Sequence, residues 1–392
     1  MLTASAPSLN APRHKSAPPT VPLCFSLGIM AWNEEATIVQ TLTSLFAQSV
    51  FAALAARGER CEIMCLANGC TDGTVAVTRE YFQLMARTHR YAAAFTARVV
   101  DIPEPGRNNA WNRFVHADSA RETRFIYLMD ADIIFRQADT ILNLFTTLEQ
   151  NLRADVASGR QHKDIEFKAH KTLRDRISLA TSDLTGTIEG RFTGQLYCLR
   201  ASIARRLFLP RDLGAVDDGF FKAAICTEFF EHEPDGRRIA QAPRAAHVYQ
   251  AYVAPAEVLN NQKRQMIGQT TVHVLVEYLK TLPTEERSDL AVLLRRLDEE
   301  DPDWLKRRVD RHIASIRFFW QLFPGLLTFR FKRLARLKGI RRLTHLPATL
   351  AGFAVTMLAC ARAHRFLKGG STYYWPKAER LPRFTSASGA VD

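Results

Sequence analysis

Apolar runs and stretches with helical periodicity alternate along the first third of the chain. The runs suit buried strands and cover residues 22–31, 61–67, 95–102 and 124–130. The stretches between them repeat apolar side chains every three or four positions and predict helices over 34–57, 74–89 and 107–120. Strands that alternate with helices predict an α/β fold with a mostly parallel central sheet, flanked by helices on both faces.

Polar side chains gather where these predicted strands end. Residues 33–35 (NEE) follow the first strand, residues 68–72 (NGCTD) follow the second, and Asp130 and Asp132 follow the fourth. In parallel sheets of this kind, ligands bind beyond the carboxyl ends of the strands. We therefore expect one cleft to collect the polar chemistry.

The two aspartates one residue apart interrupt an apolar run, YLMDADIIF. Side chains at such spacing can reach a common point where the backbone leaves strand geometry, and their charges repel unless a cation lies between them. Mg²⁺ or Mn²⁺ suits oxygen ligands and takes up phosphate oxygens, so the pair suggests a metal-bound diphosphate. The alternative is structural: Asp132 caps a helix and Asp130 lies in a turn.

The composition describes a folded protein. Of the 392 residues, 47% are hydrophobic, which is enough for a core, and the length allows one large domain or about two to three ordinary ones. Residues 1–20 are rich in Pro, Ser and Ala, have no apolar signal segment, and are expected to form a disordered leader. Seven cysteines with no CxxC pair predict buried thiols in a reducing compartment, the cytoplasm.

The charge is unevenly distributed along the chain. The net charge is +13, yet the segment from Trp304 to Arg380 alone holds 17 lysines and arginines against Asp310 and Glu379. This asymmetry, with a charged stretch at 283–303, predicts a catalytic domain over 21–282 and a basic helical region over 283–392. Basic residues mixed with aromatics suit an anionic membrane surface, here the inner face of the cytoplasmic membrane, and no nucleic-acid motif is present.

Residues 343–361 carry no Lys, Arg, Asp or Glu, and arginines flank them on both sides. A membrane span needs about 20 apolar residues, and this segment contains His345 and Pro347. Three interpretations remain open: a core helix, an interfacial or re-entrant segment on anionic lipid, and a true span.

Several motifs occur together in a known order. They are SLGIMAWNEEATIVQTLTSL, LANGCTDGT, RNNAWN, YLMDADIIF, TGQLYCLR and AVDDGFF. With them the chain resembles family 2 glycosyltransferases of the GT-A (Rossmann-like) fold, from about Ser26 to Arg264. The resemblance implies a metal-dependent, inverting transfer of a sugar from a nucleotide diphosphate to an acceptor hydroxyl, in cell-surface glycan or glycolipid synthesis. It also implies a glycan, lipid-linked or small-molecule acceptor.

The resemblance assigns roles by position. The donor residues it implies are Asn33, Glu35, Asn68, Asp72, Arg107, Asp130 and Arg264. It implies Asp130 and Asp132 as metal ligands, His247 as a third ligand or phosphate donor, and Gly194 as the small residue near the acceptor. Two positions depart from the family: Asn68 replaces an acidic residue, and Arg107 stands where lysine is common. No tryptophan follows Arg264, which disfavours a processive synthase.

The catalytic base is implied by the acidic pair in AVDDGFF. Asp218 matches the base, and Asp217 stands where the family has glutamate. The base takes the proton of the acceptor hydroxyl as it attacks the anomeric carbon, and a neighbouring carboxylate raises its pKa towards the useful range. The alternative is a pair of acidic residues that stabilises a helix N-terminus.

Two other hypotheses remain at this stage. A degenerate GT-A fold could serve as a basic binding module on membranes or nucleic acid, but the set of Asp130, Asp132 and Asp218 argues against it. A nucleotidyltransferase would need a glycine-rich loop after the first strand, where only Gly28 is found. The sugar, the nucleotide, the acceptor and the oligomeric state are not specified by these patterns.

Overall fold

The computed structural model describes residues 21–172, 174–176, 178–179, 192–214, 216–337 and 339–370. The expected disordered leader, residues 1–20, lies outside this part of the chain.

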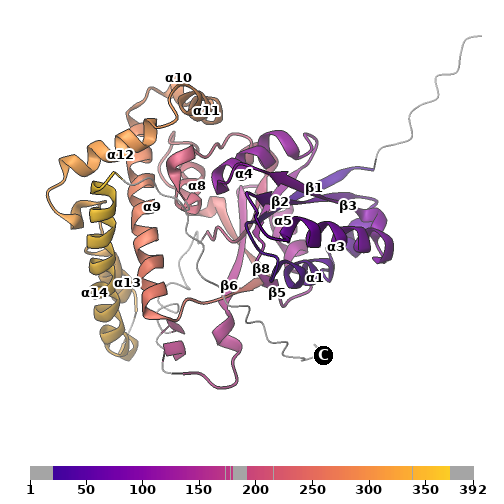
Figure 1. Ribbon diagram of the computed structural model, residues 1–392, viewed down its shortest axis with the longest axis horizontal. Helices are drawn as coiled ribbons and strands as arrows, with labels where there is room; N and C mark the ends of the chain where they lie inside the picture. The colour runs from indigo at the N-terminus through magenta and orange to yellow at the C-terminus, as the bar shows by residue number, and fades with distance from the viewer. Residues whose placement is uncertain are drawn as a thin grey trace, which may run out of the picture.

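An eight-stranded sheet forms the centre of the molecule (Figure 1), with the strand order β3-β2-β1-β4-β7-β6-β8-β5. Its strands are β1 (Leu23–Ala31), β2 (Arg60–Asn68), β3 (Phe95–Ile102), β4 (Phe125–Asp130), β5 (Ile134–Phe135), β6 (Val156–Lys163), β7 (Leu196–Arg200) and β8 (Ile239–Tyr249). The strands β3, β2, β1 and β4 pair in parallel, whereas β7 runs antiparallel to β4 and β6. The four predicted strands and the mostly parallel α/β sheet are confirmed.

Helices cover both faces of this sheet and form a separate layer at the C-terminal side (Figure 1). They are α1 (Ile38–Phe46), α2 (Val50–Arg57), α3 (Thr74–Thr88), α4 (Arg107–Arg113), α5 (Thr140–Gln150), α7 (Ala201–Ala204), α8 (Asp217–Cys226), α9 (Pro255–Thr281), α10 (Thr284–Arg287), α11 (Leu290–Glu300), α12 (Trp304–Ser315), α13 (Phe329–Ala335) and α14 (Ile340–Lys368).

The helical stretch predicted over 34–57 is divided in two. The helices α1 and α2 meet at an angle of 43°. At the break, Gln48 donates a hydrogen bond from Nε2 to the carbonyl of Gln137 (2.8 Å) and accepts one from the backbone N–H of Ile141 (3.2 Å). These partners lie some ninety positions further along the chain, so local periodicity could not reveal the break.

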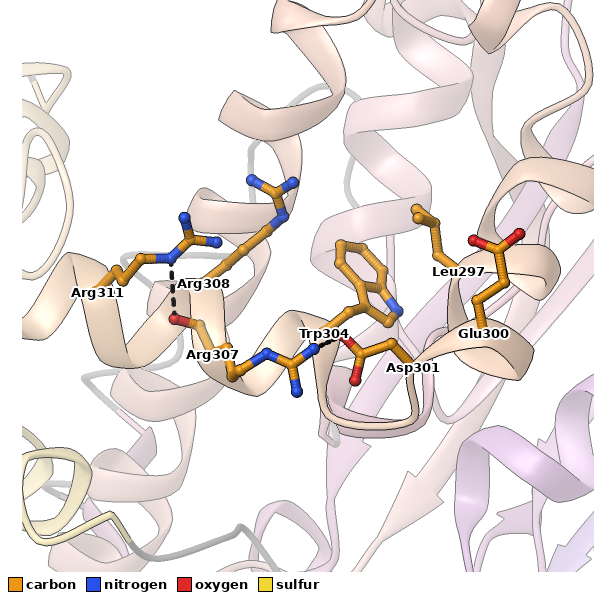
Figure 2. Close-up of a pocket in the computed structure, with 7 residues that line it drawn as sticks. All are labelled: Leu297, Glu300, Asp301, Trp304, Arg307, Arg308 and Arg311. Atoms are coloured by element: carbon orange, nitrogen blue, oxygen red, sulfur yellow. Dashed lines mark hydrogen bonds and ion pairs between the residues drawn. The ribbon is translucent and has the colours of Figure 1, made fainter.

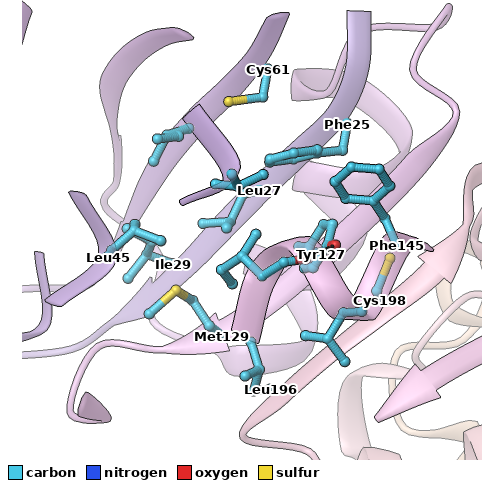
Figure 3. Packing of buried hydrophobic residues seen from close by; sticks show 14 of the residues in the cluster. Phe25, Leu27, Ile29, Leu45, Cys61, Tyr127, Met129, Phe145, Leu196 and Cys198 are labelled. Atoms are coloured by element: carbon cyan, nitrogen blue, oxygen red, sulfur yellow. Dashed lines mark hydrogen bonds between the residues drawn. The ribbon is translucent and has the colours of Figure 1, made fainter. Parts of the chain in front are cut away.

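Side chains alternate between the two faces of the sheet, as strand geometry requires. On β1, Phe25, Leu27 and Ile29 point into one buried cluster, with Tyr127 of β4 and Phe145 of α5 (Figure 3). The cluster on the other face contains the intervening residues of β4 and the buried sides of α4, α8 and α9. The sheet therefore separates two apolar layers, and helix α4 is held on the same face as α8.

The long helix α9 joins the sheet domain to the C-terminal helices. On one side it meets α8, where a Cβ added at Gly268 would lie 2.0 Å from Val216 Cγ2. On another side Met266 and Ile267 share a third apolar cluster with residues of α12 and α14. Because α9 packs against both parts, the domain boundary between residues 282 and 283 stays a prediction.

The cysteines are all free thiols, and six of the seven are buried. Cys61 and Cys65 lie on β2 inside the core, where burial raises the pKa of Cys65 to about 12. The prediction of buried thiols is confirmed for these two positions, and Cys70 is half-buried.

Candidate active site

Arg107, the first residue of α4, lies at the centre of the polar cluster. Its Nη1 donates to Asp130 Oδ1 at 2.7 Å, and its Nη2 donates to the carbonyl of Gly194 at 3.0 Å. Its Nε lies 3.6 Å from Asp217 Oδ2, which is an ion-pair distance but too long for a good hydrogen bond. One guanidinium thus joins the end of β4, the segment before β7 and the start of α8.

The loop before α4 is shaped to present this arginine. Gly106 has a φ of 155°, which favours glycine, and its N–H donates to Asn68 Oδ1 at 2.9 Å. The resemblance assigned Asn68 to the nucleotide base, but here its side-chain oxygen holds the loop that leads to Arg107. The side-chain oxygen of Asn68 therefore makes a structural hydrogen bond to the backbone of this loop.

Helix α4 is also fastened to the segment that leads into α8. Asn112 exchanges two hydrogen bonds with Leu209, at 2.8 and 2.9 Å, and Asn108 donates to the carbonyl of Pro210 at 3.0 Å. These hydrogen bonds hold α4, which begins with Arg107, against the segment that leads to the acidic pair. They therefore help to position Arg107 relative to that pair.

The acidic pair begins helix α8, with Asp217 buried and Asp218 half-buried. Burial raises the pKa of Asp217; Arg107 opposes this rise, and Asp130 adds to it. Burial, and then the charge of Asp217, raise the pKa of Asp218 to about 6. Burial lowers the pKa of Arg107, but Asp130 and Asp217 outweigh this effect and raise it. A carboxyl group with a pKa near 6 suits a general base at neutral pH.

Gly194 lies directly beside this pair. A Cβ at this position would lie 3.3 Å from Asp217 Oδ1 and 3.8 Å from Asp218 Cβ. A side chain at this position would therefore crowd the carboxylate of Asp217, and glycine avoids this contact.

A second polar chain runs from Asp130 to His247. The backbone N–H of Asp130 donates to the carbonyl of Gln195 at 2.9 Å, and Gln195 Oε1 lies 3.3 Å from His247 Nε2. His247 is fully buried on β8, where it pairs with Phe135. Gln195 was missed at the level of sequence; its place next to Gly194 was the only available signal.

The loops after β1 and β2 are bonded to each other. Asn33, with a φ of 54°, accepts at Oδ1 from the N–H of Thr71 at 2.7 Å. The N–H of Glu35 donates to Asp72 Oδ2 at 3.2 Å, and Glu35 Oε2 accepts from Gly73 at 2.8 Å. Asp72 Oδ1 also accepts from Thr74 N at 3.1 Å, at the start of α3. The predicted convergence of the loops is confirmed, and Asp72 makes a cap-like contact.

The two remaining predicted residues lie on other segments. Asp132, 9% exposed, sits in the turn between β4 and β5. Arg264 lies on α9 one turn before Gly268, and therefore on the face that meets Val216.

The carboxylates suit a metal that is shared with a ligand rather than enclosed by protein. Within the described residues, no three His, Cys, Asp or Glu side chains converge closely enough to hold an ion alone. Mg²⁺ is commonly held by one or two carboxylates together with water and phosphate oxygens. Asp130 and Asp132 are the carboxylates that could hold such an ion, and Gln195 links buried His247 to the backbone N–H of Asp130.

A separate pocket of about 240 Å³ lies on α11 and α12, and Figure 2 shows its lining. Arg307 pairs there with Asp301, and Arg308 lies over the ring of Tyr278 at 3.4 Å. None of the predicted site residues lines this pocket, so it is distinct from the carboxylate cluster.

Residues 26–206 match the family model described as Glycosyl transferase family 2. No curated protein matches the chain. Among solved structures, the mannosyltransferase PcManGT from Pyrobaculum calidifontis, in complex with GDP-Man and Mn²⁺, is 18% identical, with a TM-score of 0.50; the match covers 92% of this chain and 91% of that one. TarS 1–349 of S. aureus, with UDP-GlcNAc, is 13% identical, with a TM-score of 0.45, and covers 91% and 95%. At these identities the likeness concerns the fold alone.

Proposed function

We propose that this protein transfers a sugar from a nucleotide diphosphate to an acceptor hydroxyl with inversion, because residues 26–206 match the family model Glycosyl transferase family 2. The observation that supports this most strongly is the position of Arg107 between Asp130 and Asp217. The guanidinium of Arg107 connects the carboxylate of Asp130, at the edge of the sheet, with the acidic pair on α8. Donor and acceptor would therefore meet at one place.

In this mechanism Asp218 acts as the general base. Its carboxylate accepts the proton of the acceptor hydroxyl while the hydroxyl oxygen bonds to the anomeric carbon. The bond from that carbon to the diphosphate breaks in the same step, and the electron pair leaves with the nucleoside diphosphate. A single in-line displacement inverts the configuration. Burial and the charge of Asp217 raise the pKa of Asp218, and Arg107 opposes the rise that burial causes in the pKa of Asp217.

We assign Asp130 and Asp132 to a divalent ion, Mn²⁺ or Mg²⁺. When bound, the ion would supply neutralisation of the departing diphosphate. The PcManGT structure contains Mn²⁺ with its donor, which agrees with this assignment. His247 supports the site through Gln195, which holds the backbone of Asp130.

The donor's nucleotide would lie over the joined loops after β1 and β2, near Asn33, Glu35, Asn68 and Asp72. Arg264 on α9 would meet the diphosphate from the opposite side. The open space beside Gly194 would admit the acceptor hydroxyl, whether it belongs to a glycan, a lipid-linked sugar or a small molecule. Free cysteines support a cytoplasmic enzyme that serves cell-surface glycan or glycolipid synthesis.

A degenerate fold that only binds membranes or nucleic acid is the second hypothesis. This hypothesis does not explain why Asp217 is buried next to half-buried Asp218, beside an arginine. Burial of charge costs free energy, which function or pairing must compensate. The transferase is therefore the function that the site supports best.

The proposal is tested by incubating the protein with a panel of nucleotide sugars and Mn²⁺ and measuring release of nucleoside diphosphate. We expect release from at least one donor, and loss of release when a chelator removes the ion. Calorimetry on the same panel measures donor binding directly. If no nucleotide sugar binds in the presence of Mn²⁺ or Mg²⁺, the transferase proposal is wrong.

Replacing Arg107 with alanine should change how the reaction depends on pH. In the unmodified protein, kcat/KM should fall as the pH drops through about 6, because the base must be ionised. Loss of the guanidinium removes a positive charge next to Asp217, so the pKa values of Asp217 and Asp218 should rise. The pH at which kcat/KM falls on the acidic side should therefore increase by about one pH unit. The control is Arg113→Ala, at the last residue of α4, which removes an exposed ion pair with Asp118. This variant should not change the pH at which kcat/KM falls.

A further inference from the structure

Helix α14 exposes a continuous apolar stripe to solvent. Ile340, Leu343, Leu350 and Leu358 are 75%, 70%, 50% and 49% exposed, and Leu346 is 38% exposed. Their spacing of three, four or eight residues places them along one side of the helix. Scattered exposed leucines are ordinary, but an aligned series on one helix marks an interaction surface.

The opposite side of α14 is packed against protein. Ala359, Cys360, Ala363 and Leu367 are buried in the cluster shared with α9 and α12. Figure 1 shows α14 on the far side of α9 from the sheet. The segment Arg342–Lys368 is long and apolar enough to cross a bilayer, and 22% of its most apolar window is buried. Because α9 holds one of its sides, a position along a surface fits the helix better than a crossing.

The stripe lies in a strongly basic part of the chain. Residues 311–370 contain twelve lysines and arginines and no aspartate or glutamate. Helix α13 lies beside α14, with the rings of Phe331 and Phe353 at 5.3 Å, and its Lys332 and Arg336 are exposed. An apolar stripe bordered by basic side chains is the pattern of helices that lie at an anionic lipid surface.

The two helices are fixed to each other by a half-buried arginine. Arg330 Nε donates to Thr356 Oγ1 at 2.8 Å, and its Nη1 lies 2.6 Å from where a Cβ at Gly352 would be. Burial and then the charge of Arg333 lower the pKa of Arg330.

We propose that α13 and α14 form a docking surface for an anionic lipid bilayer, with the stripe of α14 in the headgroup region. A second copy of the chain is disfavoured as the occupant, because it would bring the exposed basic side chains Lys332 and Arg336 opposite their own copies. Nucleic acid would match the charge but not the exposed leucines. This surface does not depend on the proposed transfer reaction, and it corresponds to the interfacial interpretation of residues 343–361.

The test is sedimentation of the full chain with vesicles of phosphatidylcholine mixed with phosphatidylglycerol, compared with phosphatidylcholine alone. We expect binding to the anionic vesicles, with weakening as salt increases. The variant Lys332→Glu/Arg336→Glu should bind at least about tenfold more weakly, since each basic residue near the surface contributes about fivefold. Its control, Arg79→Glu/Arg87→Glu on α3, makes the same change in net charge at exposed positions elsewhere.

The apolar stripe is tested separately by Ile340→Ser/Leu343→Ser/Leu350→Ser. These side chains are exposed, so the fold should be unaffected, as circular dichroism and thermal unfolding can verify. We expect about tenfold weaker vesicle binding or more. The matched control is Leu84→Ser/Leu152→Ser/Val292→Ser, which removes exposed apolar side chains from other helices and loops. Equal binding by the stripe variant and its control would overturn the proposal. The proposal would also be wrong if the protein did not bind vesicles and instead formed a concentration-dependent dimer that the stripe substitutions disrupt.

Discussion

Asp218→Asn is expected to leave nucleotide-sugar binding intact and to lower kcat by about 10²- to 10⁴-fold, the usual contribution of a general base. Asparagine keeps the size of the side chain and can still accept from the N–H of Gly219, which Asp218 Oδ1 does at 2.8 Å. It cannot take the acceptor's proton. Steady-state kinetics give kcat, and calorimetry with the donor gives binding independently.

The neighbouring carboxylates serve as controls for this result. Asp212→Asn changes another aspartate whose pKa is raised by burial and that lies shortly before α8, and it should retain turnover. If Asp218→Asn also retains turnover, the base is not Asp218, and Asp217 becomes the candidate. A loss of donor binding in Asp218→Asn would instead indicate that the pair serves the donor.

Asp132→Asn is expected to weaken metal-dependent donor binding by at least about 100-fold, because neutral asparagine is a poorer ligand for a divalent ion that also carries a diphosphate. The measurement is calorimetric titration of a nucleoside diphosphate in the presence and absence of Mn²⁺. It requires no turnover and no acceptor, so it reports on the site alone.

Asp139→Asn is the matched control for Asp132→Asn. Asp139 follows closely along the chain and pairs with exposed Arg244 at 2.9 Å. Its replacement should leave the Mn²⁺-dependent step unchanged. Unchanged Mn²⁺-dependent binding in Asp132→Asn would remove Asp132 from the metal site and leave it a structural role in the turn after β4.

The electrostatic arrangement explains why both carboxylate positions matter. Arg107 lies between Asp130 and Asp217, so a change on either side alters the charge felt by the other. Buried charges interact more strongly than exposed ones, because water screens them less. The proposed base and the proposed donor site would thus be coupled through one side chain, and the pH profile of Arg107→Ala would measure this coupling.

The pattern of residues was sufficient for much of the fold and for part of the site. Continuous apolar runs identified four strands and helical periodicity identified the helices between them, since burial dictates where apolar side chains recur. The polar residues after β1, β2 and β4 were expected at one edge, and the parallel pairing of these strands brings them there. Motifs in a known order indicated a resemblance to the same family whose model matches residues 26–206.

Other features depended on partners that are distant along the chain. The break between α1 and α2 follows from hydrogen bonds of Gln48 to the start of α5. The contact of Asn68 with Gly106, and the link from Asp130 through Gln195 to His247, likewise join separate segments. No local sequence pattern predicts such pairs, because each of these polar groups could hydrogen-bond with many others, and only the folded chain brings one of them close.

The amino-acid sequence alone determined the α/β pattern, the acidic and basic residues available for chemistry, and the concentration of positive charge near the C-terminus. The tertiary structure decided which of these residues share one site, that Arg107 joins Asp130 to Asp217, and which side of α14 remains exposed. The physical reason is that periodicity and charge are properties of neighbours along the chain. Burial, pKa and ion pairing are instead set by whatever the fold places within a few ångströms.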